Sequence, residues 1–261
     1  MEIKLFRPHS LEEALSQRAE YGRDALPIAG GQSLLVMLRN KLIDPKVLLD
    51  LEPLGELRGL QVRADGISIG AMTTFFDLIS STDVHKASPI LAQAAAKVGS
   101  TAIRNLGTIG GNLCHNEPGA DLPPALLALN ASVELRSRNA TRKVPLTEFF
   151  QGYFETAVEA DEILSRVDIP TLPQGACGAY IKHSISPEDL AIAGVAVVLV
   201  PDGKNPVSAR ELRIGLGGVS PVPLRALNAE AALNGRALTD QAIQAAAEIA
   251  ASEAEPMSDP H

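Results

Sequence analysis

The chain has 261 residues, of which 46% are hydrophobic and 21% charged, a composition typical of a globular protein with an ample core. The formal net charge is −8 at pH 7, tryptophan is absent and aromatic residues make up only 3%. Nucleic-acid binding needs a basic surface or stacking aromatic residues, so we expect none. The longest apolar run, 190–200, is too short to span a membrane, and the opening MEIKLFRPHSLEEAL lacks the apolar core of a signal peptide.

The cysteine content limits the chemistry of the chain further. Cys114 and Cys177 are the two cysteines, too few to ligate an iron–sulfur cluster or a structural zinc. Cys114 and His115 are neighbours in sequence, and adjacent residues of a loop rarely reach one reaction centre together. We therefore expect a cytosolic enzyme or enzyme subunit with no metal ligands and no catalytic side chain of its own.

The first fifty residues alternate between strand and helix patterns. We expect strands at 4–7, 26–29 and 47–51, and helices at 11–19 and 32–40. Ser10 and Glu13 have the S-x-x-E spacing of a capping box, and the pair Gly30–Gly31 ends the second strand.

The middle of the chain mixes strands with short helices. We expect a hairpin of 57–62 with 66–70, helices at 73–80, 89–98 and 122–129, and strands at 131–137 and 162–169. Ser88 precedes Pro89 at the start of the second helix, and Asp121 precedes the third, so we expect both to be N-caps.

The pattern changes after Pro170. A linker-like TLPQGACG precedes expected strands at 179–182, 191–200 and 211–217 and expected helices at 226–233 and 239–254. The sequence thus predicts an α+β protein of three domains, 1–56, 57–172 and 173–261.

Two adjacent-glycine motifs, PIAGGQSLL and GTIGGNLCH, indicate a binding site. Glycine permits a positive φ and leaves no side chain between the backbone amides and a ligand. Successive N–H groups beside a helix start bind anions, so each motif could hold one phosphate of a pyrophosphate. Because neither motif is a P-loop or a G-x-G-x-x-G fingerprint, a nucleoside-triphosphate or nicotinamide site is disfavoured. The alternative is a pair of ordinary tight turns.

Three stretches together resemble a known family: AGGQSLL at 29–35, STAIRNLGTIGGN at 100–112 and PGADLPPALLALNASVEL at 118–135. They are similar to the FAD-binding medium subunits of the molybdenum hydroxylases, which include carbon monoxide dehydrogenase and the flavin domain of xanthine dehydrogenase. The resemblance extends from the first strand to the C-terminal helices. It implies the two-subdomain FAD-binding fold of these flavoproteins, with FAD held noncovalently between the subdomains, and a C-terminal α+β domain.

The resemblance also implies a set of FAD-binding residues. The first pyrophosphate turn corresponds to Ala29, Gly30, Gly31, Gln32 and Ser33, with Leu34 alongside, and the second to Thr108, Ile109, Gly110, Gly111 and Asn112. Asp121 matches an acid that binds the ribityl or phosphate region, and His115 and Glu117 share its loop. Ile163 and Leu164 match residues lining the isoalloxazine, Tyr180 a ring-shielding aromatic, and Lys182 a cation near the pyrimidine edge that favours the reduced flavin.

The sequence departs from the family at two places. The segment 184–187 replaces the arginines that often follow the Y-x-K stretch of the family. Relatives continue past EPMSDPH into a further helix, so we expect the third domain to be incomplete here.

The function implied is electron transfer within a molybdenum hydroxylase complex. Partner subunits would carry the molybdenum cofactor, on a large subunit, and [2Fe–2S] clusters, on a small one, in a heterotrimer that is cytoplasmic or peripheral to the inner face of the membrane. Electrons would leave FAD for an external acceptor, a quinone, NAD⁺, O₂ or a carrier. The alternatives are a stand-alone flavin oxidase acting on a small organic substrate and a non-catalytic anion-binding scaffold.

Overall fold

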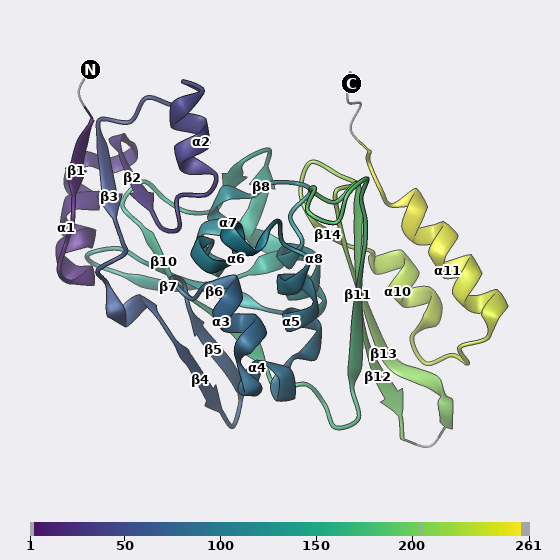
Figure 1. The fold of residues 1–261 in the computed structure, drawn as a ribbon. Helices are drawn as coiled ribbons and strands as arrows, with labels where there is room; N and C mark the ends of the chain where they lie inside the picture. The colour runs from purple at the N-terminus through teal and green to yellow at the C-terminus, as the bar shows by residue number, and fades with distance from the viewer. Residues whose placement is uncertain (1–2, 204, 257–261) are drawn as a thin grey trace.

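The computed structural model describes residues 3–203 and 205–256. Three sheets follow one another along an elongated molecule, with the N-terminal segment at one end and the last two helices at the other (Figure 1). We propose these three sheet-based units as the three domains expected from the sequence. The tail from 257 onward, part of the EPMSDPH stretch, lies outside the described residues.

The N-terminal unit is a small parallel sheet of order β1-β3-β2. Its elements are β1 (Lys4–Phe6), α1 (Leu11–Tyr21), β2 (Ala25–Ile28), α2 (Leu34–Arg39) and β3 (Val47–Asp50). Helix α1 places Leu11, Ala14 and Leu15 in a core with Leu49 of the central strand. The β-α-β connections thus bring the end of β2, where the first glycine pair lies, to one edge of the sheet.

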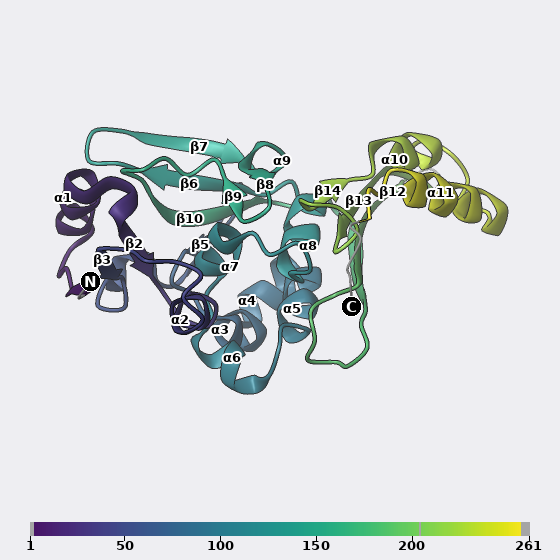
Figure 2. The same cartoon turned by 90° about the horizontal axis from the view of Figure 1, so that it is seen from above.

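The middle unit is an antiparallel sheet of order β4-β5-β10-β6-β7, with most of the helices gathered on one face (Figure 2). Its strands are β4 (Leu60–Arg63), β5 (Gly66–Gly70), β6 (Ser132–Arg136), β7 (Thr141–Pro145) and β10 (Ile163–Pro170), with a small ribbon of β8 (Phe150–Gly152) and β9 (Glu155–Thr156). Its helices are α3 (Phe75–Ser80), α4 (Thr82–Ala87), α5 (Pro89–Ala96), α6 (Thr101–Leu106), α7 (Ile109–His115), α8 (Leu122–Ala128) and α9 (Leu146–Phe149). The largest core of the molecule lies between this sheet and α3, α5, α7 and α8.

The C-terminal unit is an antiparallel sheet of order β11-β12-β13-β14 packed between helices on both faces. It consists of β11 (Cys177–His183), β12 (Ala193–Asp202), β13 (Asn205–Gly217), β14 (Leu224–Arg225), α10 (Leu227–Leu233) and α11 (Asp240–Ser252). Tyr180, Ala196 and Val198 join the large core of the middle unit, whereas Ile214 and Leu216 pack under α10 and α11.

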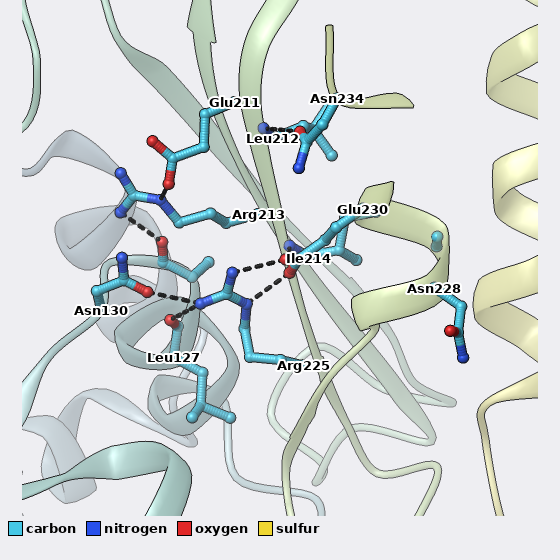
Figure 3. Close-up of polar contacts among 12 residues, drawn as sticks. Leu127, Asn130, Glu211, Leu212, Arg213, Ile214, Arg225, Asn228, Glu230 and Asn234 are labelled. Atoms are coloured by element: carbon cyan, nitrogen blue, oxygen red, sulfur yellow. Dashed lines mark hydrogen bonds and ion pairs between the residues drawn. The ribbon is translucent and has the colours of Figure 1, made fainter. Parts of the chain in front are cut away.

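A group of buried charges fixes the C-terminal unit to the end of α8 (Figure 3). Arg213 donates from Nη1 to the carbonyl oxygen of Ala128 (3.2 Å), and Arg225 donates from Nη1 to that of Leu127 (3.2 Å). Glu230 of α10 accepts from Nη2 of Arg225 (2.7 Å). Since the last carbonyls of a helix lack partners within it, Arg213 bonds a carbonyl that α8 leaves open. Arg225 adds a second donor to the carbonyl oxygen of Leu127, which also accepts from Asn130 N–H (3.0 Å). We call Arg213, Arg225 and Glu230 the arginine clasp.

Three expected helix caps differ in detail. Ser10 Oγ accepts from the N–H of Glu13, but the Glu13 carboxylate accepts from His9 N–H rather than completing a box. Ser88 precedes α5 without a side-chain capping bond. Asp121 precedes α8 but makes no capping bond either, because its carboxylate is engaged elsewhere. A complete capping box instead begins α3, between Thr74 and Asp77.

Several short elements were not expected from the sequence, namely β7, β8, β9, β14, α4, α6, α7 and α9. Each is short, and β7 is a largely exposed edge strand, so neither pattern nor length distinguishes these elements from loops. No helix within 3–203 and 205–256 combines the length and apolarity needed to cross a membrane.

Candidate functional site

A cleft of about 800 Å³ opens where the N-terminal and middle units meet. Its walls are the turn between β2 and α2, the start of α7, the loop before α8, the β8–β9 ribbon, the start of β10 and the segment 188–190. This volume lies in the range of sites that bind cofactor-sized ligands.

The first glycine pair forms a turn of free backbone donors. Gly31 has a φ of +69°, the left-handed region that favours glycine. The N–H groups of 30–33 have no hydrogen-bond partner within the described chain, while all four residues line the cleft. Unpaired N–H groups at a ligand-sized cleft are suited to binding an anion.

The second glycine pair has a different conformation. Gly110 and Gly111 lie in the first turn of α7, and neither has a positive φ. The N–H of Gly110 donates to Ala71 O (2.9 Å), and that of Gly111 donates to Thr108 Oγ1 (3.1 Å). The N–H groups of Ile109 and Asn112 are bonded as well. The two motifs are therefore not equivalent, and only the first leaves a row of backbone N–H groups open.

Close approach of other parts of the chain explains one glycine of each motif, Gly110 and Gly30. A Cβ on Gly110 would lie 2.6 Å from the Cβ of Ala71, so α7 could not pack against the end of β5. A Cβ on Gly30 would lie 1.9 Å from the carbonyl oxygen of Leu106. A Cβ on Gly111 would point between the two motifs, 3.6 Å from Ala29. The two motifs, eighty residues apart in sequence, thus lie side by side.

Asn112 supplies an unsatisfied polar atom to the same wall. Its side-chain oxygen Oδ1 is buried and has no hydrogen-bond partner among residues 3–203 and 205–256. Burying such an atom is costly unless a ligand or water bonds it. The lining also includes apolar side chains, among them Leu34, Met37, Ile163 and Leu164. The cleft thus has a polar end for charged or hydroxyl groups and an apolar wall for a flat ring.

Asp121 is the most deeply buried carboxylate of the cleft, with 3% of the residue exposed. Its Oδ1 accepts from the Tyr180 hydroxyl (2.8 Å) and its Oδ2 accepts from Lys182 Nζ (3.0 Å). Burial raises the pKa of the Asp121 carboxyl, and the bonds from Lys182 and Tyr180 oppose that rise. Neither Tyr180 nor Lys182 is part of the cleft wall.

Three further titratable groups of the cleft lie in surroundings that favour their uncharged forms. Burial lowers the pKa of His115, so its imidazole is neutral at pH 7. Burial raises the pKa of Glu117, which the N–H of Gly119 partly offsets. Cys114 is an exposed residue of the cleft wall, and desolvation by the surrounding protein raises the pKa of its thiol, which Arg18 opposes. A protonated thiol is a poor nucleophile, which argues against covalent catalysis by Cys114.

Several cleft residues were not named by the sequence analysis, Arg18 and Phe154 among them. Arg18 is only 6% exposed and donates from Nε to Glu162 O (3.2 Å) and from Nη1 to Gly22 O (2.6 Å). Arg18 lies on the same face of α1 as the buried Leu11, seven residues earlier. A charged residue on the apolar face of a predicted helix could have indicated a functional residue from the sequence. Phe154 has a left-handed φ of +53° and a ring 5.1 Å from that of His115, which no sequence pattern indicates.

The cleft brings together fifteen of the residues expected to bind FAD. They are Ala29, Gly30, Gly31, Gln32, Ser33, Leu34, Thr108, Gly110, Gly111, Asn112, His115, Glu117, Asp121, Ile163 and Leu164. Ile109 is fully buried in the core, and Tyr180 and Lys182 lie behind Asp121. The assignment of each residue to a part of the cofactor stays a prediction.

The residues present fit FAD by their chemistry. Open N–H groups at 30–33 suit a pyrophosphate, the unpaired Oδ1 of Asn112 needs a donor, and the Asp121 carboxylate can accept hydrogen bonds from hydroxyl groups. The apolar wall at Ile163 and Leu164 suits a ring system.

Comparisons with known proteins agree with this geometry. Residues 1–172 match the family described as the FAD binding domain in molybdopterin dehydrogenase, and residues 179–261 match the CO dehydrogenase flavoprotein C-terminal domain. The chain is 39% identical to the carbon monoxide dehydrogenase medium chain of Hydrogenophaga pseudoflava, over 97% of this chain and 87% of that protein. It is 31% identical to the xanthine dehydrogenase FAD-binding subunit of Escherichia coli O157:H7, over 97% and 86% respectively.

Solved structures show the same similarity. A structure of carbon monoxide dehydrogenase from Hydrogenophaga pseudoflava that lacks the Mo-pyranopterin moiety of its molybdenum cofactor matches with a TM-score of 0.95 over 99% of this chain and 89% of that chain. Quinoline 2-oxidoreductase from Pseudomonas putida 86 matches with a TM-score of 0.93 at 34% identity, over 100% of this chain and 90% of that chain.

Proposed function

The chain belongs to the FAD-binding medium subunits of the molybdenum hydroxylases, and from this premise we propose that it is the electron-transfer subunit of such a complex. In this proposal a large partner subunit holds the molybdenum cofactor and a small one holds [2Fe–2S] clusters. Electrons pass from those clusters to this subunit and leave for an external acceptor. Bound FAD would supply the redox chemistry, since its isoalloxazine takes up and releases electrons.

The observation that carries the proposal is the turn at 30–33. Its four open N–H groups face the cleft beside the buried, unpaired Oδ1 of Asn112, and no partner within the described chain satisfies either. A buried oxygen such as Asn112 Oδ1 is costly to leave unpaired, and open N–H groups at a cleft suit an anion, so we infer a ligand that bonds both. The side chains position and enclose the cofactor, and the proposal gives none of them a role as nucleophile.

A second candidate function is a stand-alone flavin oxidase. The neutral His115 and the carboxyl of Glu117, with its raised pKa, line the cleft and could act as base and acid on an organic substrate. In the electron-transfer proposal these two groups only line the wall.

The test separates the two functions by reduction of the chain alone. We expect the purified full chain to be yellow with one noncovalent FAD per chain, released by acid precipitation. We expect candidate substrates such as CO, aldehydes and N-heterocycles not to bleach its flavin absorbance under anaerobic conditions. Adding the small and large partner subunits should restore substrate-dependent bleaching.

Dithionite is the control, because it should bleach the chain without partners. Rapid bleaching by an organic substrate with the chain alone would contradict the electron-transfer proposal and support the oxidase. A colourless chain that binds no added FAD would contradict both functions and leave a non-catalytic anion-binding scaffold as the remaining alternative.

A further inference from the structure

Arg18 is a buried cation in the wall of the cleft. Only 6% of the residue is exposed, and it is among the residues that line the cleft. Its Nε and Nη1 donate to backbone carbonyl oxygens, those of Glu162, Gly22 and Ala25. Within the described chain Nη2 makes no hydrogen bond, and the guanidinium forms no ion pair with a carboxylate. A buried charge without a counter-charge is costly, so this end of the cleft favours a ligand group that carries a negative charge.

The neighbouring acidic groups do not balance the charge of Arg18. Glu162 gives it only a carbonyl oxygen, because the carboxylate accepts from Arg142 Nε (2.6 Å) and Nη2 (2.8 Å). Asp161 is partly exposed, and it forms no ion pair with Arg18 in the described part of the chain. Desolvation raises the pKa of the Cys114 thiol, which therefore stays protonated and neutral at pH 7. Burial lowers the pKa of Arg18 itself, but a guanidinium remains protonated at neutral pH.

Arg18 lies at the end of the cleft away from the open N–H groups at 30–33. Its Nη1 bonds the carbonyl oxygen of Ala25, the first residue of β2, whereas the turn at 30–33 follows the end of that strand. Five residues of extended chain span about 15 Å, so a pyrophosphate at the turn would not balance the charge of Arg18. Nε bonds Glu162 O (3.2 Å), directly before Ile163, which packs in one core with α1. Arg18 is thus next to the part of the wall predicted to hold the isoalloxazine.

We propose that Arg18 supplies a fixed positive charge that stabilises the reduced, anionic isoalloxazine relative to the oxidised, neutral one. This inference rests on the proposed FAD-binding function. Reduction adds two electrons, which the partner's clusters supply in the complex, and one proton, and it leaves the ring system with one negative charge. Because three carbonyl oxygens hold the guanidinium in place, its charge is already oriented before the electrons arrive. The reduced ring provides the counter-charge that Arg18 lacks within the described chain.

The midpoint potential of the bound flavin tests this role. It is measured on the purified full chain by anaerobic titration with dithionite, in equilibrium with a redox dye of known potential. Arg18→Met should weaken the binding of reduced FAD at least about tenfold more than that of oxidised FAD. This is the size expected for two unit charges up to about 10 Å apart at an effective dielectric constant of about 20. For a two-electron couple, a tenfold difference lowers the potential by about 30 mV.

Arg18→Lys and Arg23→Met are the matched controls. Arg18→Lys keeps the charge but loses the planar fork that bonds the three carbonyl oxygens. It should lower the Tm and change the relative binding of reduced and oxidised FAD by less than about twofold. Arg23 also lines the cleft, but it is exposed and its charge is screened by water. Arg23→Met should therefore change that relative binding by less than about threefold.

If Arg18→Met does not fold, Arg18→Gln is measured in its place, because its neutral amide can still donate to a carbonyl oxygen. A neutral variant that keeps the wild-type potential would overturn the inference and restrict Arg18 to fixing α1 against the start of β10. An equal fall of the potential in Arg23→Met would also overturn it, because net charge alone would then explain the shift. A wild-type chain that binds no FAD would instead contradict the proposed function.

Discussion

Replacing Gly111 by Asp is expected to yield a chain that purifies without FAD. A Cβ at this helical position would lie 3.0 Å from Thr108 Oγ1 and 3.6 Å from the Cβ of Ala29, the residue before the open N–H groups at 30–33. Two unit charges about 6 Å apart repel by about 3 kcal/mol at an effective dielectric constant of about 20, which is about a hundredfold in Kd. The ratio of flavin to protein absorbance after gel filtration, and the Kd for added FAD, measure the effect.

Gly111→Asn is the matched control, because it has the same shape without the charge. It should bind FAD more weakly than the wild type but about a hundredfold more tightly than Gly111→Asp. Gly31→Asp tests the first motif independently, since Asp tolerates the positive φ of that position. Gly55→Asp is a control outside the cleft: a Cβ added at Gly55 would meet no neighbouring atom within 4 Å, so this variant should retain FAD. Full flavin content in both Gly111→Asp and Gly31→Asp would show that the cleft does not hold the pyrophosphate.

The glycine motifs illustrate what local sequence can and cannot predict. Two adjacent glycines at a strand end or helix start correctly indicate close backbone approach at both places. Whether their N–H groups stay open depends on carbonyls elsewhere. Ala71 and Thr73, more than thirty residues earlier in the chain, accept from two N–H groups of the second motif, and Thr108 accepts from two more. No residue of the described chain accepts from the N–H groups at 30–33. This information lies in the tertiary structure, so the sequence alone could not show which of the two motifs leaves its N–H groups open.

Asp121 shows the same limit for a side chain. Its position before a helix predicts a cap, and α8 does begin at the next residue. The carboxylate instead bonds Tyr180 and Lys182, about sixty residues later, because the C-terminal sheet packs on this segment. The longer strands and helices followed from periodicity, as for β12 and α11. The packing of the C-terminal unit on the middle unit, which places Asp121 at the cleft, could not be predicted in this way. The residue pattern of one element does not show which other element it packs against.

Replacing Glu230 by Ala is expected to lower the free energy of unfolding by about 3–5 kcal/mol, the cost of breaking a buried ion pair by removing one partner. Glu230 is 6% exposed and accepts from Arg225 Nε (2.5 Å), from Arg225 Nη2 (2.7 Å) and from the N–H of Ile214 (2.7 Å). Without the carboxylate, the guanidinium of Arg225 stays largely buried next to α8 with its charge uncompensated. Urea unfolding followed by circular dichroism measures the change.

The pair Lys46–Asp24 provides the control, since both side chains are about half exposed (57% and 49%). Lys46→Ala should cost no more than about 1 kcal/mol, because exposed ion pairs are screened by water. Glu230→Gln should fall between the two, since its amide oxygen can still accept from Ile214 but carries no charge to balance Arg225. If the free energy of unfolding of Glu230→Ala lies within about 1 kcal/mol of the wild-type value, the arginine clasp does not hold the C-terminal unit on α8. The apolar contacts of Tyr180, Ala196 and Val198 with the middle unit, together with the bonds of Tyr180 and Lys182 to Asp121, would then carry that attachment.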